Sequence, residues 1–364
     1  MKCTVEKELL LTHLQRVCNV VNRKVALPIL SMIHVKAEKD SLILRTTNLE
    51  IELESTLKAN VEESGTTTIP AKSLLTLVSK LNGTEVSFHS NKKFQSTIQC
   101  GNAEFKLLGL DPKDFPEVFT FESKRKITLE QKLLSRMIDS VAFAVSIDDS
   151  RKTLQGILLS VKDGVLTAVS TDGKRLALVE TQIEDNTANG DIIVPLRTAL
   201  EIRRQLGKEG MVELGIDDKT IRVQIENTVM LSKLIEGIYP NFRQIIPSNF
   251  QKEVELPRNA VQQALELVAV PQTEVADGVK LTLHRNKLEL YTQNSSIGEG
   301  RDVVDINYGY EDEISLVFNT AFLLDPFRYT DKENFRMKII DPTSPVALED
   351  GTGFLYVVMP LRKK

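Results

Sequence analysis

The stretch KCTVEKELLLTHLQRVCNVV at residues 2–21 has two counterparts farther along the chain. KITLEQKLLSRMIDSVAFAV occupies residues 126–145, and EVELPRNAVQQALELVAVP occupies residues 253–271. Each begins with an alternation of apolar and polar residues, typical of a strand, and continues with apolar residues at helical spacing. Because self-similarity at a fixed long period indicates a repeated architecture, the chain is predicted to contain three copies of one unit.

A second landmark recurs in the same order. IPAKSLLTLVSKL begins at Ile69, VPLRTALEIRRQL at Val194 and FNTAFLLDPFRYT at Phe318, and each runs from a strand end into a helix. Stretches with period-two alternation around polar turns lie between these landmarks, which is typical of hairpins. We therefore predict an α+β fold of three domains, residues 1–124, 125–249 and 250–364. Each domain is expected to be two strand–helix–strands units, with antiparallel sheets covered by helices on one face.

Composition excludes several classes of protein. Hydrophobic residues make up 41% and charged residues 26% of the chain, the balance of a soluble globular protein. No apolar run approaches the roughly 18 residues of a membrane span. Charges at the N-terminus stand where a signal peptide has an uncharged core. We expect a cytoplasmic protein in which Cys3, Cys18 and Cys100 are reduced, buried thiols.

Motifs of catalysis are absent from the sequence. It contains no phosphate-binding P-loop, no dinucleotide fingerprint, no zinc-protease motif and no serine-hydrolase elbow, so we expect no cofactor and no metal. Asp148-Asp149 could form a carboxylate pair, and Asp217-Asp218 is interpreted as a solvated turn between strands. A repeated architecture without such motifs favours binding over catalysis. An enzyme remains an alternative that would need a site not visible in the sequence.

Positive charge gathers on the expected helices, although the net charge of the chain is -4. Lys72 and Lys80 lie two turns apart on one helix face, and Arg197 and Arg204 repeat this spacing in another helix. A solvated helix surface explains one such helix, but recurrence across repeats favours a continuous basic surface. The chain has no tryptophan, so contact with duplex phosphates fits better than base stacking.

The stretch VSTDGKRLALV, Val169–Val179, places a polar turn between two apolar runs. A Gly-Lys pair beside a hydroxyl and a carboxylate suits a phosphate, a metal ion, a peptide or an ordinary hairpin. The spacing of a P-loop is missing, so the residues alone predict a hairpin-like turn.

Taken with its neighbours, this turn resembles a known family over the whole chain length. The matching motifs are ALPILSMIHV (26–35), TNLEIELE (47–54), IPAK (69–72), DFPEV (114–118), STDGKRLA (170–177), YPNFRQIIP (239–247) and YVVMPLR (356–362). They are similar to those of bacterial DNA sliding clamps, the beta subunits of DNA polymerase III. The resemblance implies a non-catalytic processivity factor. It also implies a head-to-tail homodimeric ring around duplex DNA, with helices lining the hole and sheets outside.

The resemblance further implies a cleft for short peptides of the polymerase, the clamp loader and repair proteins. Its matching positions are Leu154, Thr171, Gly173, Lys174, Arg175, Leu176, Pro240, Ile245, Phe322, Val346, Val357, Met359, Pro360 and Leu361. Apolar residues would receive the apolar side chains of a peptide, with Met359 able to repack around different ones. Lys174 and Arg175 would hold its polar parts.

Two other implied sites complete the resemblance. Implied DNA contacts are Lys24, Lys72, Arg151, Lys152 and Arg197, and implied dimer contacts are Phe105, Leu107, Val270 and Pro271. The chain departs from the family in several places: Lys174 stands where some members have histidine, Lys152 and Thr153 where some have tyrosines, and Pro342 and Pro345 where many have serines. The alternative within the binding class is a peptide-binding scaffold that never encloses DNA.

Overall fold

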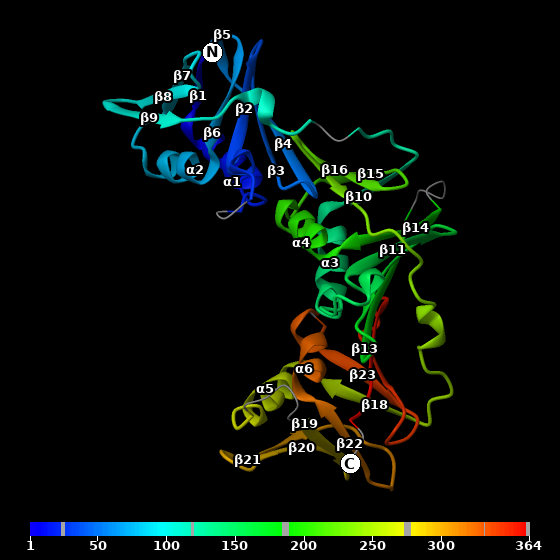
Figure 1. Cartoon of the computed structure of the whole chain (residues 1–364). Coiled ribbons are helices and arrows are strands. Elements are labelled where there is room, and N and C mark those ends of the chain that lie inside the picture. Colours follow the sequence, from blue (N-terminus) through cyan, green and yellow to red (C-terminus); the bar gives the residue numbers. More distant parts are fainter. Residues whose placement is uncertain (23–25, 118–119, 184–188, 273–277, 331, 362–364) are drawn as a thin grey trace. The chain divides into compact units, whose positions relative to one another are not determined.

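The computed structural model describes residues 1–22, 26–117, 120–183, 189–272, 278–330 and 332–361 (Figure 1). Its contacts divide the chain into two compact units. Unit 1 comprises Met1–Leu133 and Leu200–Leu234, and unit 2 comprises Leu134–Ala199 and Ile235–Lys364. Each unit therefore contains part of the predicted second domain. The division at residues 124 and 249 follows the sequence repeat and stays a prediction.

Unit 1 contains two antiparallel sheets and the helices α1 (Lys7–Val17) and α2 (Ala71–Lys80). The smaller sheet has the order β5-β1-β7-β8-β9, formed by Asn60–Glu63, Lys2–Glu6, Glu85–Ser90, Gln95–Cys100 and Ala103–Leu108. The larger sheet has the order β10-β15-β16-β17-β4-β3-β2-β6. Its strands are Arg125–Glu130, Met211–Ile216, Thr220–Ile225, Thr228–Lys233, Ile51–Lys58, Ser41–Thr47, Met32–Glu38 and Gly65–Pro70.

Unit 2 likewise contains two antiparallel sheets, with the helices α5 (Arg258–Val268) and α6 (Thr320–Arg328). Its smaller sheet has the order β21-β20-β19-β22, formed by Gly298–Asp305, Lys287–Asn294, Gly278–His284 and Ile314–Asn319. Its larger sheet has the order β14-β11-β12-β13-β25-β24-β23-β18. The strands are Gly190–Pro195, Gly156–Lys162, Val165–Thr171, Arg175–Gln182, Phe354–Val358, Val346–Glu349, Asn334–Ile339 and Lys252–Pro257.

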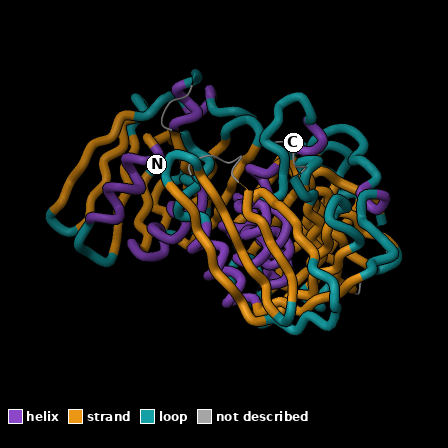
Figure 2. The backbone as a smooth tube through the Cα atoms, turned by 90° about the horizontal axis from the view of Figure 1, so that it is seen from below, coloured by secondary structure: helices purple, strands orange, loops and turns teal. Residues whose placement is uncertain are grey.

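Helices α3 (Gln131–Ala142) and α4 (Leu196–Gln205) each have residues in both units. Strand makes up more of the backbone than helix (Figure 2). Burial alternates along β2 and β3, as the period-two patterns predict. In α1 the buried residues Leu10, Leu14 and Val17 recur at helical spacing. The predicted α+β class with antiparallel sheets is confirmed.

The two eight-stranded sheets have one topology. Reading β18-β23-β24-β25-β13-β12-β11-β14 against β10-β15-β16-β17-β4-β3-β2-β6 pairs each strand with a partner of the same place in the order. Registers agree as well: Thr47 faces Glu52 across β3 and β4, and Thr171 faces Leu176 across β12 and β13. Positions in the paired parts of one sheet therefore have defined equivalents on the other.

The three cysteines are buried and unpaired, as predicted. Burial raises the pKa of the Cys3 thiol to about 11 and that of Cys18 to about 12, so both stay protonated and unreactive at neutral pH. In the described part of the chain, no helix combines the length and the apolar character needed to cross a membrane.

Candidate partner-binding site

The turn Thr171–Arg175 joins β12 to β13 and is closed by its own side chains. The Thr171 hydroxyl donates to the Arg175 carbonyl at 2.6 Å and accepts from the Gly173 amide at 3.0 Å. The Asp172 carboxylate accepts from the backbone amides of Lys174 and Arg175 at 2.9 and 3.1 Å. Gly173 has a φ of +85°, a conformation that favours glycine. The sequence-based prediction of a hairpin-like turn agrees with this geometry.

Strand β25 pairs with β13 beside this turn, and the Met359 amide donates to the Lys174 carbonyl at 3.0 Å. A cluster of buried apolar residues lies under both strands, here called the floor: Leu154, Leu158, Val169, Leu176, Leu178, Ile193, Tyr239, Phe242, Ala347 and Val357. At the rim, Ile245, Met359 and Leu361 are 43%, 40% and 40% exposed. Exposed apolar residues beside an apolar floor suit the apolar side chains of a ligand.

The structure brings most predicted cleft residues into unit 2 around this floor. Leu154, Leu176 and Val357 are part of it, and Thr171 and Gly173 shape the turn. Lys174 is exposed and Phe322 on α6 is partly exposed. Val346 is fully buried behind the surface, where it pairs with Val358. The exposed residues, together with the floor, are called the partner site below.

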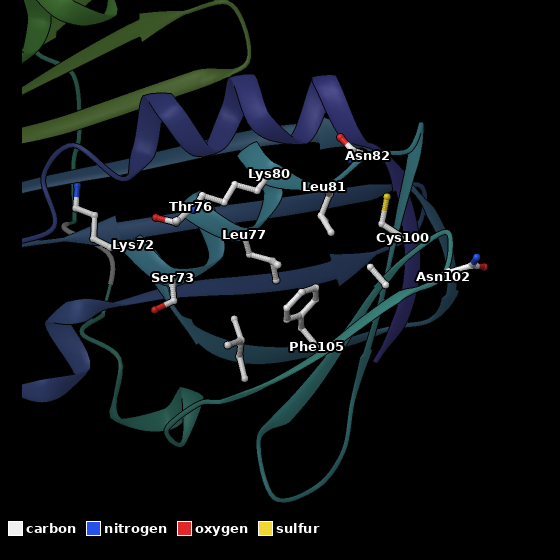
Figure 3. Close-up of a pocket in the computed structure, with 12 residues that line it drawn as sticks. Lys72, Ser73, Thr76, Leu77, Lys80, Leu81, Asn82, Cys100, Asn102 and Phe105 are labelled. Atoms are coloured by element: carbon white, nitrogen blue, oxygen red, sulfur yellow. The ribbon is translucent and has the colours of Figure 1, made fainter.

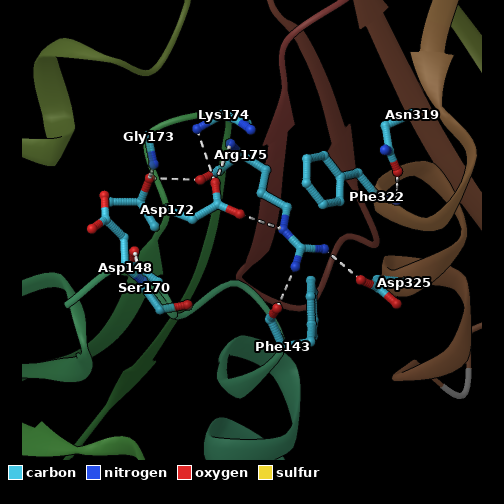
Figure 4. A network of polar contacts seen from close by, with 12 residues as sticks. Phe143, Asp148, Ser170, Asp172, Gly173, Lys174, Arg175, Asn319, Phe322 and Asp325 are labelled. Carbon is cyan, nitrogen blue, oxygen red and sulfur yellow. Dashed lines mark hydrogen bonds and ion pairs between the residues drawn. The ribbon is translucent and has the colours of Figure 1, made fainter. Parts of the chain in front are cut away.

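Arg175 differs from its exposed neighbour Lys174, because its side chain is only 10% exposed (Figure 4). Its Nε donates to Asp172 Oδ2 at 3.1 Å, its Nη2 donates to the Phe143 carbonyl at 2.6 Å, and its Nη1 pairs with Asp325. The guanidinium is thus occupied within the protein. The prediction that it holds polar parts of a peptide does not fit this placement.

Sequence reasoning missed three members of this network, Phe143, Asp325 and Tyr356. Tyr356 donates its hydroxyl to the Phe322 carbonyl at 2.8 Å, and its burial raises its pKa above the usual range. Asp325 follows Phe322 by three residues on α6 and therefore lies on the same helix face. That spacing was a usable signal, whereas nothing local pointed to the Phe143 carbonyl.

Family models match this chain in three consecutive segments. Residues 1–119 match the N-terminal domain of the DNA polymerase III beta subunit, residues 128–241 its central domain and residues 243–362 its C-terminal domain. The chain belongs to the DNA polymerase III beta subunit family. Members of this family are non-catalytic processivity factors of that polymerase, and this function is favoured over a scaffold that does not enclose DNA.

Curated relatives of this beta subunit family extend over the full length. The beta sliding clamp of Chlamydia muridarum is 31% identical over 363 residues, covering 100% of this chain and 99% of the relative. The beta sliding clamp of Escherichia coli K12 is 31% identical over 368 residues, with 100% of both chains covered.

Solved structures give the same result. The sliding clamp of Pseudomonas aeruginosa bound to griselimycin has a TM-score of 0.95 and 29% identity, with 100% of both chains covered. The DNA polymerase sliding clamp of Caulobacter crescentus has a TM-score of 0.92 and 31% identity over 100% of both chains.

The DNA contacts predicted for this family member fall in different surroundings. Lys24 lies outside the described residues. Lys72 is partly buried and donates its Nζ to the Cys18 carbonyl at 2.6 Å. Arg151 is exposed, pairs with Asp148 at 3.2 Å and lies against Gly173, because a Cβ there would be 2.7 Å from its Nη1. Lys152 and Arg197 are exposed. Arg151 therefore borders the partner site.

A pocket of about 970 Å³ in unit 1 contains two predicted dimer contacts, Phe105 and Leu107 (Figure 3). It lies between α2 and the β8–β9 hairpin, with Leu77 and Leu81 on the helix side. Phe105 is 43% exposed. In unit 2, Val270 is 77% exposed, whereas Pro271 is buried in its own chain and is not available to a partner.

Proposed function

We propose that this family member works as a ring-shaped homodimer. The ring encircles duplex DNA, slides along it and tethers the replicative polymerase, the clamp loader and repair proteins at the partner site. We place it in the cytoplasm, where replication occurs in bacteria. The observation that carries the tethering role is the apolar floor with its exposed rim at Ile245, Met359 and Leu361. The P. aeruginosa clamp solved with griselimycin supports a ligand site in this family, and we propose that griselimycin binds this chain at the partner site.

The dimer joins are proposed to form between the two smaller sheets, which both end in an edge strand. β9 is the edge of the sheet in unit 1, and β21 is the edge of the sheet in unit 2. An unpaired edge beside exposed apolar residues invites pairing with another chain. Phe105 and Leu108 are 43% and 68% exposed on β9, and Val303 is 42% exposed on β21.

Residues next to these edges favour the same join. Leu267 and Val270, at the end of α5, are 62% and 77% exposed. Each edge carries both signs of charge: β9 has Glu104 and Lys106, and β21 has Arg301 with the carboxylates of Glu299, Asp302 and Asp305, so ion pairs across the join would depend on its register. Each chain offers both edges once, so head-to-tail joining can close a ring, and we propose that two copies close it.

Helix packing supports a ring of two chains. Twelve helices, six described in each chain, with axes about 10 Å apart form a circle about 38 Å across, and about 28 Å remains after helix thickness is subtracted. A duplex, whose major groove alone is about 12 Å wide, needs roughly 20 Å. Six helices leave only about 9 Å, so one chain is too small to surround DNA.

The decisive experiment reverses the character of the β9 edge. Phe105→Asp with Leu107→Asp is expected to give folded monomers by light scattering, which no longer stay on nicked circular DNA. Ile147→Asp is the matched control, since Ile147 is 93% exposed outside both edges and should leave the dimer intact. A double variant that stays dimeric refutes the join. A wild-type protein that is retained equally on circular and linear DNA refutes encirclement.

A further inference from the structure

Arg175 carries an inference that goes beyond the proposed partner site while resting on it. Each of its three guanidinium nitrogens already has an acceptor, in Asp172, Asp325 and the Phe143 carbonyl. These acceptors come from its own turn, from α6 and from the residue that follows α3, respectively. A side chain held from three directions and 10% exposed has little left to offer a ligand.

What Arg175 does contact is the ring of Phe322. Its guanidinium carbon lies 4.1 Å from the Phe322 ring centroid, close enough for a cation–π interaction. Asn319 Oδ1 accepts from the Phe322 amide at 3.0 Å, and the Tyr356 hydroxyl donates to the Phe322 carbonyl at 2.8 Å. The backbone of Phe322 is therefore fixed at both ends, and its ring is supported by Arg175 (Figure 4).

The eight-stranded sheet of unit 1 shows that the fold does not require an arginine at this position. By register, the residue equivalent to Arg175 is Ile51, which pairs with Ser232 on β17 as Arg175 pairs with Val358 on β25. Ile51 is 1% exposed, and its turn is closed by the same hydrogen bonds. Since the turn and the strand pairing form without a guanidinium, Arg175 serves something that only unit 2 has.

We propose that Arg175 is a positioning residue that holds the Phe322 ring as a wall of the partner site, without touching the bound partner. The ring then offers a fixed apolar face to an apolar side chain of the ligand. The Arg175 guanidinium affects ligand binding only by holding the Phe322 ring. Lys174, one residue earlier and exposed, is left as the basic group of the turn that meets polar parts of the ligand.

A double-mutant cycle separates positioning from direct contact. Griselimycin is the ligand used as probe, and its dissociation constant is measured by calorimetry for the full-length protein. Arg175→Lys keeps the charge and loses the planar fork, so affinity should fall roughly tenfold, within the range of couplings seen for contacting residues. The affinity of Phe322→Ala for griselimycin should fall at least as far. The combined variant should bind no more weakly than Phe322→Ala alone.

Two controls fix the interpretation. Lys174→Gln combined with Phe322→Ala should give additive losses, because Lys174 acts independently of the ring. Arg336→Lys makes the same substitution on β23 of the same sheet, where the arginine is exposed and pairs with Glu253 at 2.9 Å, and should leave the affinity unchanged. Asp325→Asn loosens the guanidinium from α6 without altering Arg175. It should reproduce the loss of Arg175→Lys and keeps the test open if that variant does not fold.

The outcomes are distinguishable from those of the proposed function. If the wild type does not bind griselimycin, or if Phe322→Ala binds it normally, the partner site itself is wrong and this inference falls with it. If Phe322→Ala weakens binding but the loss from Arg175→Lys adds to it in full, the partner site stands and the positioning role is refuted. Loss of affinity in Arg336→Lys would equally overturn it, because the effect would then be general to the sheet.

Discussion

The turn Thr47–Ile51 in unit 1 and the turn Thr171–Arg175 in unit 2 are closed by the same hydrogen bonds. The first threonine hydroxyl donates to the last carbonyl at 3.0 Å in unit 1 and at 2.6 Å in unit 2. The carbonyl of the fourth turn residue then accepts an amide from the next part of the sheet. In unit 1 the Lys233 amide donates to Glu50 at 3.1 Å, and in unit 2 the Met359 amide donates to Lys174 at 3.0 Å. Backbone architecture at the two places is therefore equivalent.

Side chains at the equivalent positions differ in kind. Charged or polar residues of unit 1 replace apolar floor residues of unit 2 at five positions: His34 for Leu158, Arg45 for Val169, Glu52 for Leu176, Thr68 for Ile193 and Arg222 for Ala347. The buried apolar cluster there shrinks to Ile29, Leu30 and Phe115. The two sheets therefore share a backbone, and the proposed partner site depends on apolar side chains that only unit 2 has at these positions.

Two of these charged residues of unit 1, Arg45 and Glu52, form an ion pair with each other. Arg45 donates its Nη2 to the Pro116 carbonyl at 2.7 Å and lies 3.8 Å from Glu52, which is 3% exposed. Its guanidinium carbon also lies 5.1 Å from the Phe115 ring centroid. Arg45 Nε itself is buried without a hydrogen-bond partner, so this charged surface is only partly satisfied, and it offers no apolar surface to a ligand.

The largest effect is expected from moving one of these charges into unit 2. Leu176→Glu puts a glutamate at the position equivalent to Glu52. Its neighbour in unit 2 is Val169, so the arginine that pairs with Glu52 in unit 1 is missing. A carboxylate without a partner is expected to cost about 3–5 kcal/mol of unfolding free energy and to abolish griselimycin binding. Denaturant unfolding and calorimetry measure both.

A matched pair of variants sharpens this prediction. Leu176→Met conserves volume and should retain binding with a stability change under about 1.5 kcal/mol. Leu176→Glu combined with Val169→Arg rebuilds the pair of unit 1 and should recover part of the stability but none of the binding. Recovery of binding would show that the floor is not what selects the ligand.

The next effect concerns pH. Burial, with Arg45 and Lys36 adding to it, lowers the pKa of His34 from 6.5 to about 4. The unfolded chain therefore binds a proton that the folded protein refuses between these values, and stability falls as pH falls through this window. His34→Leu, which installs the residue of position 158, should flatten this loss.

Between pH 7 and pH 5, the loss attributable to His34 is expected to be about 1–2 kcal/mol. Denaturant midpoints of the wild type and His34→Leu at the two pH values measure it. His13 remains in the variant as an internal reference, since burial lowers its pKa as well. An equal pH dependence in both proteins would contradict the assignment to His34.

An effect of similar size tests the equivalence of the two turns. Thr47 and Thr171 are 2% and 3% exposed, and each hydroxyl makes two hydrogen bonds within its turn. Replacing either by alanine should cost about 1–2 kcal/mol. Only Thr171→Ala should also weaken griselimycin binding. Unequal stability losses in chemical unfolding would break the comparison at its base.

The smallest effect comes from the third position of each turn. Leu49 has a φ of +74° where Gly173 has +85°, and it is 41% exposed. A branched side chain at positive φ is strained, so Leu49→Gly should stabilise the protein by about 0.5 kcal/mol. Gly173→Ala should destabilise it, because a φ of +85° is strained for any residue with a Cβ. Thermal unfolding distinguishes the two signs.

Patterns local to the sequence carried much of this structure. The repeated strand–helix stretches predicted the α+β class, and alternation in 31–55 around the Lys39-Asp40 turn predicted the hairpin of β2 and β3. The TDGKR residues alone predicted a hairpin-like turn, and the apolar cleft beside it was implied by the family resemblance. Such features depend on neighbours within one strand or helix, which is why they are readable from the sequence.

Features that depend on distant residues were not readable. Arg175 and Asp325 are 150 positions apart, so the burial of this guanidinium has no local sign. Lys72 was predicted to be part of a basic surface that contacts DNA. Its Nζ instead donates to the Cys18 carbonyl at the end of α1. Pro271 was expected to be a dimer contact and is buried by its own chain. In each case tertiary contact decided what a residue type could do.

β13 and β25 are neighbours in the sheet, but they are far apart in the order of synthesis. β13 ends at Gln182 and its neighbour β25 begins at Phe354, so about 170 residues must be synthesised between them. At roughly 5–20 residues per second, that takes on the order of 10–30 s. During this interval the first half of the sheet has an open edge, and the amide of Met359 has not yet reached Lys174. A chain still being translated therefore lacks the joined strands beside which the proposed partner site lies.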